Sequence, residues 1–283
     1  MRPFEVALEH HTGWDVARPV LRASADVPPM IGLANRGSRT VDIRVFALPA
    51  ISVAIEFGGN GFTVDDAGGR RAMNGLVTGL APGPVRIRGD ELECIEMRMR
   101  PPQAQALLGI SLSELDGEVI SVHDLWGSAA RRLREQLAEA RTWDERFARV
   151  ASFAIQRRLT SQVTDPEVAA AWHQIVSTRG RARVDDLAQA IGWSRKRLWS
   201  RFGAQIGVTP KRAAMLVRFR GAVERLFAGE SAADVAAACG YTDQAHLYRD
   251  ASVFATGAPR EFIEQLTATE TAHAQAWGTF FQD

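Results

Sequence analysis

The chain is poor in cysteine, and this excludes a disulfide framework. Only Cys94 and Cys239 occur among its 283 residues, too few for the bridges that stabilise small secreted proteins. Cys239 falls on the apolar side of a predicted helix. Cys94 lies in a predicted strand near Glu93 and Glu96, whose charges should raise its pKa and blunt its nucleophilicity. We therefore expect a protein of the reducing cytoplasm without a reactive thiol.

Long apolar runs are also missing. No stretch approaches the ~20 apolar residues of a membrane-spanning helix, and residues 1–5 do not begin the apolar core of a signal peptide. A net charge of +1, with 24% charged residues, is typical of a globular protein. The length suits two domains. We expect no association with membranes.

The sequence lacks a catalytic or metal-binding constellation. None of its six histidines stands at metal-site spacing from Cys, Asp or Glu, and His246 is expected to have a polar or packing role. The glycine-rich stretch 58–61 lacks the strand-loop-helix context of a phosphate-binding loop. We predict that the protein is not an enzyme and that it holds no metal and no cofactor.

What the sequence does contain is a helix-turn-helix over residues 184–202. Gly192 supplies the turn, because glycine takes a positive φ without steric cost. Ser194 is the expected N-cap of the second helix, whose buried side carries Leu198 and Phe202. The first helix has one apolar face, made by Val184, Leu187, Ala188 and Ile191. The second helix has a cationic, hydrogen-bonding face, as a helix that enters the major groove requires.

A second copy of this unit follows. Four positions of the first helix and turn recur 48 residues later as Val235, Ala236, Cys239 and Gly240, and three later ones recur at an offset of 49 as Leu247, Ala251 and Pro259. Between the copies, Thr209 and Pro210 open a long helix that runs to about Phe227 and stops at Gly229. This linker helix would let both units meet one face of DNA about one helical turn apart.

At these residues the sequence resembles the AraC/XylS family of transcription regulators. The resemblance covers roughly residues 165–266 and rests on the doubled motif and its linker helix occurring in order. The matching residues are Leu187, Ala188, Gly192, Ser194, Leu198, Phe202, 207–210, Val235, Ala236, 239–241, 243–247, Arg249 and Pro259. The resemblance implies two units that read adjacent segments of the major groove.

The resemblance also implies which side chains face the bases. These are Lys196, Trp199 and Ser200 in the first unit, and Gln244, Ala245, Tyr248 and Arg249 in the second. With Arg195 and Arg197 beside them, they are the predicted DNA-binding residues. For Trp199, contact with a thymine methyl group competes with packing on the linker helix.

The sequence departs from the family in the second unit. Ala251 stands where the family usually has a core phenylalanine, and Thr256 and Gly257 displace the glycine that normally precedes Pro259 by three residues. We expect the second unit to pack and dock differently.

The near-neutral total hides an uneven charge distribution. Residues 179–225 carry twelve Arg or Lys against three acids, a balance of +9, whereas residues 226–283 carry two Arg against eight acids, a balance of −6. Neutralisation of phosphates supplies most sequence-independent affinity for DNA. The first unit should therefore hold DNA more strongly than the second.

Residues 1–100 are predicted to form a β-rich domain. Apolar and polar residues alternate over 41–48, 52–57, 85–88 and 92–99. Residues 58–61 are predicted to make a hairpin turn into a strand at 62–64, and residues 65–69 another. Many short strands with glycine turns indicate a small barrel or sandwich. The family resemblance implies a cupin-like ligand-sensing domain.

A helical connector is predicted over residues 101–160, beginning at 103–108 after two prolines. Residues 111–114 resemble a capping box. Asp124 is expected to cap an amphipathic helix, and a second helix follows residues 141–144; these helices either pack on the β-domain or supply a dimer surface. Their apolar positions are Leu125, Ala129, Leu133 and Leu137, then Phe147, Val150, Ala151, Ala154 and Ile155.

We place the domain boundary at residues 160–164 and the DNA-binding domain at 165–266, with a first helix over 166–178 and a last helix over 261–266. A tail over residues 267–283 follows. Its late aromatic residues, Trp277, Phe280 and Phe281, are expected to dock against a domain.

The sequence thus predicts an α+β protein that works as a sequence-specific transcription regulator in the bacterial cytoplasm, at the nucleoid. Double-stranded DNA is the expected partner; a small-molecule effector, RNA polymerase and a second copy of the chain are further candidates. The alternative is an enzyme or ligand carrier on the β-domain with a DNA-binding appendage. Perturbed acid–base pairs would favour that alternative, and a pocket would favour a sensor. The apolar candidates for pocket lining, for which plain core is the stronger expectation, are Phe46, Ile55, Phe57, Ile87 and Met97.

Overall fold

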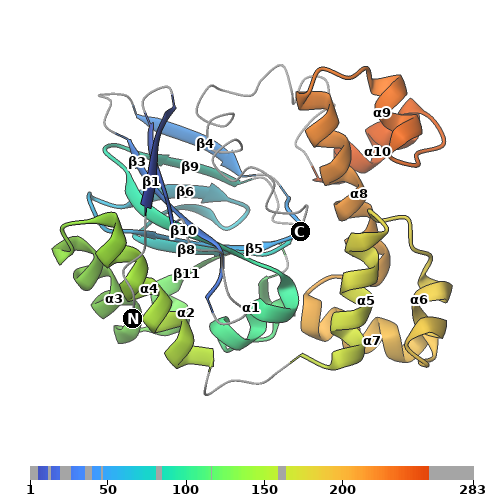
Figure 1. Cartoon of the computed structure of the whole chain (residues 1–283), viewed down its shortest axis with the longest axis horizontal. Coiled ribbons are helices and arrows are strands. Elements are labelled where there is room, and N and C mark those ends of the chain that lie inside the picture. The colour runs from blue at the N-terminus through green and yellow to red at the C-terminus, as the bar shows by residue number, and fades with distance from the viewer. Residues whose placement is uncertain are drawn as a thin grey trace.

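The computed structural model describes residues 6–11, 14–19, 27–35, 40–45, 47–80, 85–115, 117–158 and 164–254. Two antiparallel β-sheets form the N-terminal part, and the C-terminal part is helical (Figure 1). Helices α2 (Val122–Trp126), α3 (Ser128–Glu139) and α4 (Trp143–Arg158) lie against the β-sheets, away from the C-terminal helices. The predicted α+β class is confirmed.

The larger sheet has seven strands in the order β1-β2-β3-β10-β5-β8-β11. Its strands span Val6–His11, Trp14–Pro19, Met30–Asn35, Glu93–Met99, Ile51–Glu56, Gly75–Thr78 and Val119–Ser121. The smaller sheet has four, in the order β4-β9-β6-β7. These span Val41–Val45, Val85–Gly89, Phe62–Asp66 and Gly69–Met73.

Apolar side chains fill both sides of the larger sheet, as the alternation along β10 illustrates. Cys94 belongs to the cluster shared with the smaller sheet, whereas Ile95 and Met97 belong to the cluster under the helices. Successive residues of a strand point to opposite faces, so this sheet is the middle layer of a sandwich. Ile55 and Phe57 lie in the helix-side cluster with Met97, and Ile87 packs against the cluster between the sheets. The core role expected for these four is confirmed; Phe46 lies outside the described residues.

The hairpin predicted at residues 58–61 is wrong. Strand β5 pairs with β10 and β8, while β6 pairs with β9 and β7. The glycine-rich stretch therefore carries the chain from one sheet to the other. The second predicted hairpin is confirmed, because β6 and β7 pair from Phe62–Met73 to Asp66–Gly69.

The connector contains α1 (Pro101–Leu108), the 3-10 turn η1 (Leu112–Leu115), α2 (Val122–Trp126), α3 (Ser128–Glu139) and α4 (Trp143–Arg158). Asp124 is not the cap of the amphipathic helix. The hydroxyl of Ser121 accepts the N–H of His123 at 3.1 Å, so the helix begins earlier, and Gly127, at φ 54°, separates α2 from α3. A hydroxyl one turn earlier satisfies the free N–H groups, and Asp124 is left exposed on α2.

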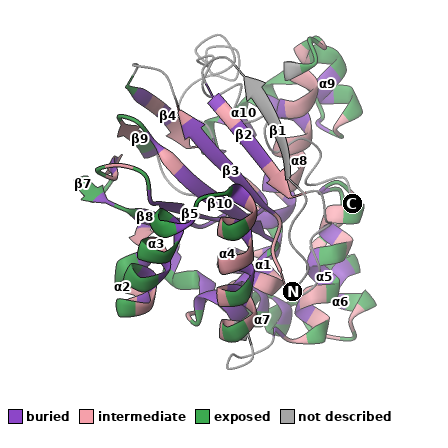
Figure 2. Ribbon diagram, turned by 60° about the vertical axis from the view of Figure 1, so that its left-hand side comes forward, coloured by how far each residue is buried: buried purple, intermediate pink, exposed green. Residues whose placement is uncertain are grey.

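The connector helices pack on the larger sheet. Leu133, Leu137, Phe147 and Val150 are buried in the helix-side cluster, and the exposed side of α2 and α3 faces away from the sheet (Figure 2). Packing on the β-domain is thus observed. A dimer surface on these helices stays a prediction.

Six described helices make up the C-terminal part. They are α5 (Pro166–Ser177), α6 (Val184–Ala190), α7 (Arg195–Ile206), α8 (Pro210–Phe227), α9 (Ala232–Ala238) and α10 (Gln244–Phe254). Figure 1 shows α6 and α7 at one end of α8, and α9 and α10 at the other. Both predicted helix-turn-helix units and the linker helix are confirmed. The helix predicted at 261–266 and the tail lie outside the described residues.

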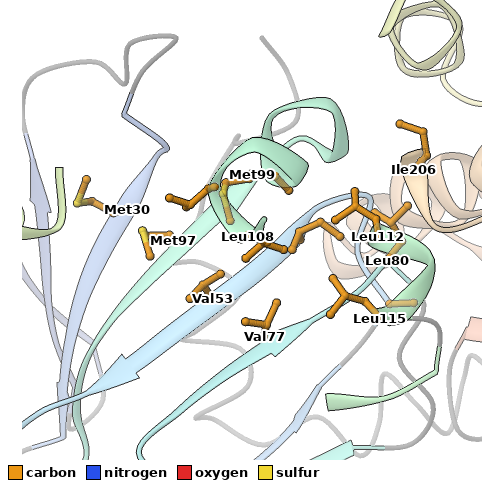
Figure 3. Close-up of a cluster of buried hydrophobic side chains, with 14 of the residues drawn as sticks. Met30, Val53, Val77, Leu80, Met97, Met99, Leu108, Leu112, Leu115 and Ile206 are labelled. Carbon is orange, nitrogen blue, oxygen red and sulfur yellow. The ribbon is translucent and has the colours of Figure 1, made fainter. Parts of the chain in front are cut away.

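The N-terminal part packs against the end of α7. Leu112 and Leu115 of η1 share a buried cluster with Ile206 of α7 (Figure 3). The Ser111 hydroxyl donates to the carbonyl of Ala204 at 2.7 Å. One apolar cluster therefore runs from the larger sheet into the first helix-turn-helix unit. The division into four segments, at residues 1–100, 101–160, 165–266 and 267–283, stays a proposal; strand β11, within the second, pairs with β8 of the first.

Candidate nucleic-acid interface

Short-range features of the sequence account for the structure of the first unit. Gly192 takes φ 70° in the turn between α6 and α7, and Ser194 Oγ accepts the N–H of Arg197 at 3.2 Å as the N-cap of α7. Leu198 and Phe202, four residues apart, have no exposed surface. The buried side of α7 therefore fixes which of its side chains point outward.

All five predicted DNA-binding residues of α7 lie on its exposed side: Arg195, Lys196, Arg197, Trp199 and Ser200. Trp199 is 42% exposed, too much for a ring packed on the linker helix. Arg197 lies over the ring of Trp193, with its guanidinium carbon 4.3 Å from the ring centroid. These five residues thus offer three cations and one open aromatic ring.

An acidic residue of α6 reaches into this surface. Asp185 Oδ1 lies 3.0 Å from Nε of Arg195, and both side chains are more than half exposed. An exposed pair of this kind contributes about 0–1 kcal/mol. A phosphate can therefore displace Asp185 at little cost.

An ion pair that the sequence did not reveal joins α7 to the start of α5. Arg201 donates to Asp165 Oδ2 from both Nε, at 2.8 Å, and Nη2, at 2.6 Å. The hydrogen bond from Arg201 holds the pKa of Asp165 below its usual value of 3.8. The amide oxygen of Gln205 accepts the Asp165 N–H at 2.8 Å. Thirty-six residues separate Asp165 from Arg201, so no helical spacing predicts the pair.

The second unit repeats the design of the first. Ser231 caps α9, Gly240 takes φ 76°, and Asp243 accepts the N–H of His246 at 2.7 Å at the start of α10. Leu247 and Ala251 have no exposed surface. The four predicted DNA-binding residues of α10, Gln244, Ala245, Tyr248 and Arg249, are all exposed.

Ala251 is accommodated without a large side chain. It lies in the same buried cluster as Phe219 of α8 and Phe254 of α10, whose rings stack with centroids 5.6 Å apart. Phenylalanines of the neighbouring turn and of α8 thus occupy this part of the core. Whether the second unit docks differently on DNA stays a prediction.

A buried charge cluster fixes α10 on α8, and the sequence did not reveal it either. Arg218 Nη2 donates to Asp250 Oδ2 at 2.8 Å, and the Arg218 guanidinium lies 4.6 Å from the centroid of the Tyr241 ring. Burial raises the pKa of Tyr241, so this phenol stays neutral. His246 packs edge-on against the same ring, with ring centroids 5.2 Å apart, and its Nδ1 accepts the N–H of Thr242 at 3.4 Å, so both expected roles, polar and packing, are observed.

The thiol of Cys94 is buried between the sheets. Burial first, and then the charges of Glu96, Glu56 and Glu93, raise its pKa. The predicted direction is confirmed, with burial as the larger cause. Among the described residues no cluster of three His, Cys, Asp or Glu could hold a metal ion, and no described helix is long and apolar enough to cross a membrane.

Residues 187–265 match the family model of a helix-turn-helix domain. Curated proteins offer no match to the chain. Among solved structures, the chain is similar to ToxT from Vibrio cholerae, with 15% identity, a TM-score of 0.47 and coverage of 81% of this chain and 98% of that one. The xylose-binding transcription activator XylR gives 18% identity, a TM-score of 0.31 and coverage of 41% and 39%. The AraC-like transcriptional activator CuxR gives 15% identity, a TM-score of 0.28 and coverage of 77% and 87%.

Likeness at these identities and TM-scores carries no conclusion about this chain. The match to the family model, the two capped units and the linker helix between them stand on their own. The resemblance drawn from the sequence is confirmed for this part of the chain: residues 187–265 match a helix-turn-helix domain of the AraC type, and the structure shows both units within residues 184–254.

Proposed function

We propose that the chain is a sequence-specific transcription regulator whose helices α7 and α10 read two adjacent segments of the major groove. One observation carries the proposal: each of these helices has a buried inner side and an exposed outer side, and every residue assigned to DNA contact lies on the outer side. A helix that enters the major groove needs this division.

The first unit supplies most of the affinity in this proposal. The predicted contact residues of α7 include three cations, whereas those of α10 include Arg249 alone, and Arg249 Nε donates to the backbone carbonyl of Ala245. Residues 179–225 also have a charge balance of +9, whereas residues 226–283 have a balance of −6. Each neutralised phosphate strengthens binding and steepens its salt dependence.

The experiment begins with sequencing the DNA fragments that the purified full chain retains. Gel-shift titrations on a recovered site then compare Lys196→Ala, Gln244→Ala and Arg132→Ala. Lys196→Ala should weaken binding by about 1–3 kcal/mol if its contact is base-specific, and Gln244→Ala by less. Arg132, exposed on α3, controls for the loss of one positive charge and should leave binding unchanged.

Equal losses for Lys196→Ala and Gln244→Ala would refute the dominance of the first unit. Failure to enrich any sequence would refute sequence-specific reading altogether.

We further propose that the N-terminal part controls how the two units meet DNA, with a small molecule as the input. The contact of η1 with the end of α7 supports this, because Ser111 and Leu112 touch the helix that carries most of the predicted contacts. A ligand regulates only if it binds one arrangement better than another. Dimerisation and contact with RNA polymerase stay predictions.

The test of this control compares DNA retention by the full chain with and without cell metabolites. In a Leu112→Ala variant, which loosens η1 on α7, the metabolite response should weaken while the preferred DNA sequence stays the same. An unchanged response in this variant would mean that η1 does not transmit the signal.

A further inference from the structure

A cleft of about 880 Å³ separates the N-terminal part from the back of the helix-turn-helix domain. Its walls come from α5, α8 and α9 on one side, and from Pro49 and the segment around Arg100 on the other. This volume is within the range of small-molecule sites, about 300–1,000 Å³. None of the predicted DNA-binding residues lines it.

Positive charge dominates the lining of this cleft. Two glutamates, Glu224 and Glu230, face six arginines there, namely Arg100, Arg179, Arg181, Arg218, Arg220 and Arg225. A concave surface lined by one sign of charge concentrates oppositely charged ligands. The lining therefore favours an anion with more than one charge.

The arginines differ in how far protein carboxylates neutralise them. Arg225 pairs with Glu230 at 2.6 Å, Arg220 with Glu224 at 2.9 Å and Arg218 with Asp250 at 2.8 Å. Arg179 and Arg181, in the turn between α5 and α6, are exposed and make no ion pair with any carboxylate that the structure describes. No described carboxylate therefore competes with a ligand for their donors.

The turn that carries these two arginines is fixed in place. Arg179 and Gly180 both have left-handed backbone, at φ 52° and 73°, a conformation that a residue with a side chain seldom adopts. Any side chain at Gly180 would meet the backbone of Ala214 in α8. The Thr178 hydroxyl accepts the N–H of Ala182 at 3.2 Å and donates to the Gln174 carbonyl at 2.7 Å. The backbone that carries the two arginine side chains is therefore fixed by the fold before a ligand arrives.

We propose that this cleft binds a small organic phosphate with at least two negative charges, held chiefly by Arg179 and Arg181. The planar guanidinium group donates two parallel hydrogen bonds to a phosphate. Since the cleft touches both parts of the chain, its occupant sets their arrangement. This regulatory consequence rests on the proposed function, whereas binding of the anion does not.

The test uses the full chain and pyrophosphate as the probe, titrated by isothermal calorimetry. The wild type should bind pyrophosphate, and the double variant Arg179→Ala/Arg181→Ala should bind it about tenfold or more weakly, since each hydrogen bond to a charged group contributes appreciably. The control, Arg195→Ala/Lys196→Ala, removes the same charge from the predicted DNA-facing side of α7 and should bind as the wild type does.

Cys239 provides a local readout, because it lines the cleft and is half-buried, while Cys94 is buried. Pyrophosphate should slow alkylation of Cys239 by iodoacetamide in the wild type and in the control variant, but not in Arg179→Ala/Arg181→Ala. Equal protection in all three proteins, or its loss in the control variant, would overturn the assignment of the site.

Gel shifts on a recovered DNA site separate the two proposals. The Arg179→Ala/Arg181→Ala variant should retain DNA without pyrophosphate, whereas a loss of binding as large as that of Arg195→Ala/Lys196→Ala would make these arginines DNA contacts and overturn the proposal. If the wild type binds DNA but not pyrophosphate, only the inference about the cleft fails. If it binds pyrophosphate but not DNA, only the proposed function fails.

Discussion

Two neighbouring acids of the first unit differ in their relation to Arg195. Asp185 reaches Arg195 at 3.0 Å, whereas Asp186, its neighbour on α6, makes no ion pair with any cation that the structure describes. Both carboxylates repel DNA through their charge, and only Asp185 also occupies a donor on the predicted interface. The two positions therefore separate a general charge effect from a specific one.

Asp185→Asn should strengthen DNA binding more than Asp186→Asn does. Both changes remove one negative charge, but only the first releases Arg195 for a phosphate. Because the pair is exposed, the extra gain should be about 0.2–1 kcal/mol, roughly a factor of 1.4 to 5 in affinity. Gel-shift titrations at two salt concentrations measure it. Identical affinities for the two variants would show that Arg195 does not depend on Asp185.

At the scale of elements, two ion pairs tie the helices of the domain together. The pair of Arg201 with Asp165 joins α7 to α5 and is partly exposed. The pair of Arg218 with Asp250 joins α8 to α10 and is largely buried. Because the two pairs differ in burial, we expect them to contribute differently to the free energy of unfolding and to its dependence on pH.

Asp250→Asn should destabilise the chain, because it removes the negative charge that faces Arg218 in a poorly solvated place. Asn keeps an acceptor oxygen, so we expect a loss of about 1–3 kcal/mol in the free energy of unfolding. Urea unfolding measures it, with Asp124→Asn on the exposed side of α2 as the control of equal charge change. If Asp250→Asn loses no more stability than the control variant, the buried pair makes no net contribution to the free energy of unfolding.

Arg201→Ala should cost stability at neutral pH and little in acid. In the folded chain, Arg201 lowers the pKa of Asp165 below 3.8. The ion pair therefore contributes fully to the free energy of unfolding above the pKa that Asp165 has in the unfolded chain. This contribution is lost as the pH falls through the lowered pKa of the folded chain. With Arg201 about half exposed, the contribution at neutral pH should be about 1 kcal/mol or less. Unfolding of both proteins at pH 6 and near pH 3 should show the difference shrink. A constant difference would assign the effect to packing of the Arg201 side chain.

At the scale of the whole molecule, the N-terminal part packs against the end of α7 at a glycine. Gly207 takes φ 89° at the C-cap, and a Cβ there would lie 2.5 Å from the carbonyl oxygen of Leu112. Gly229, at the end of α8, has nearly the same φ, 86°, and open space around it. The comparison isolates the contact between the two parts from the cost of a left-handed backbone.

Gly207→Ala should destabilise the chain more than Gly229→Ala. Both variants strain the backbone, but only the first forces η1 away from α7, and overpacking of this kind costs about 1–3 kcal/mol. Urea unfolding of both full-length variants gives the difference. Equal losses would show that η1 moves freely, and would weaken the proposal that it transmits a signal to the first unit.

The sequence by itself determined the helix-turn-helix domain. Its signals are local: a capping Ser194, a left-handed Gly192 and apolar residues at helical spacing each act within a few residues. Helical periodicity assigned the exposed side of α7, whereas the predicted DNA-binding residues of α10 were implied by the resemblance to the AraC/XylS family. Their contact with DNA stays a prediction.

Only the tertiary structure decided which strands pair and which charged side chains form ion pairs. Alternation in β5 and β6 shows which residues are buried but not which strand lies beside them, so residues 58–61 were predicted as a hairpin although they join two sheets. The same holds for the pairs of Asp165 with Arg201 and Asp250 with Arg218, and for the cleft around Arg179 and Arg181. Contacts between distant residues depend on how whole elements dock, because the apolar area they bury is non-directional and leaves no spacing in the sequence.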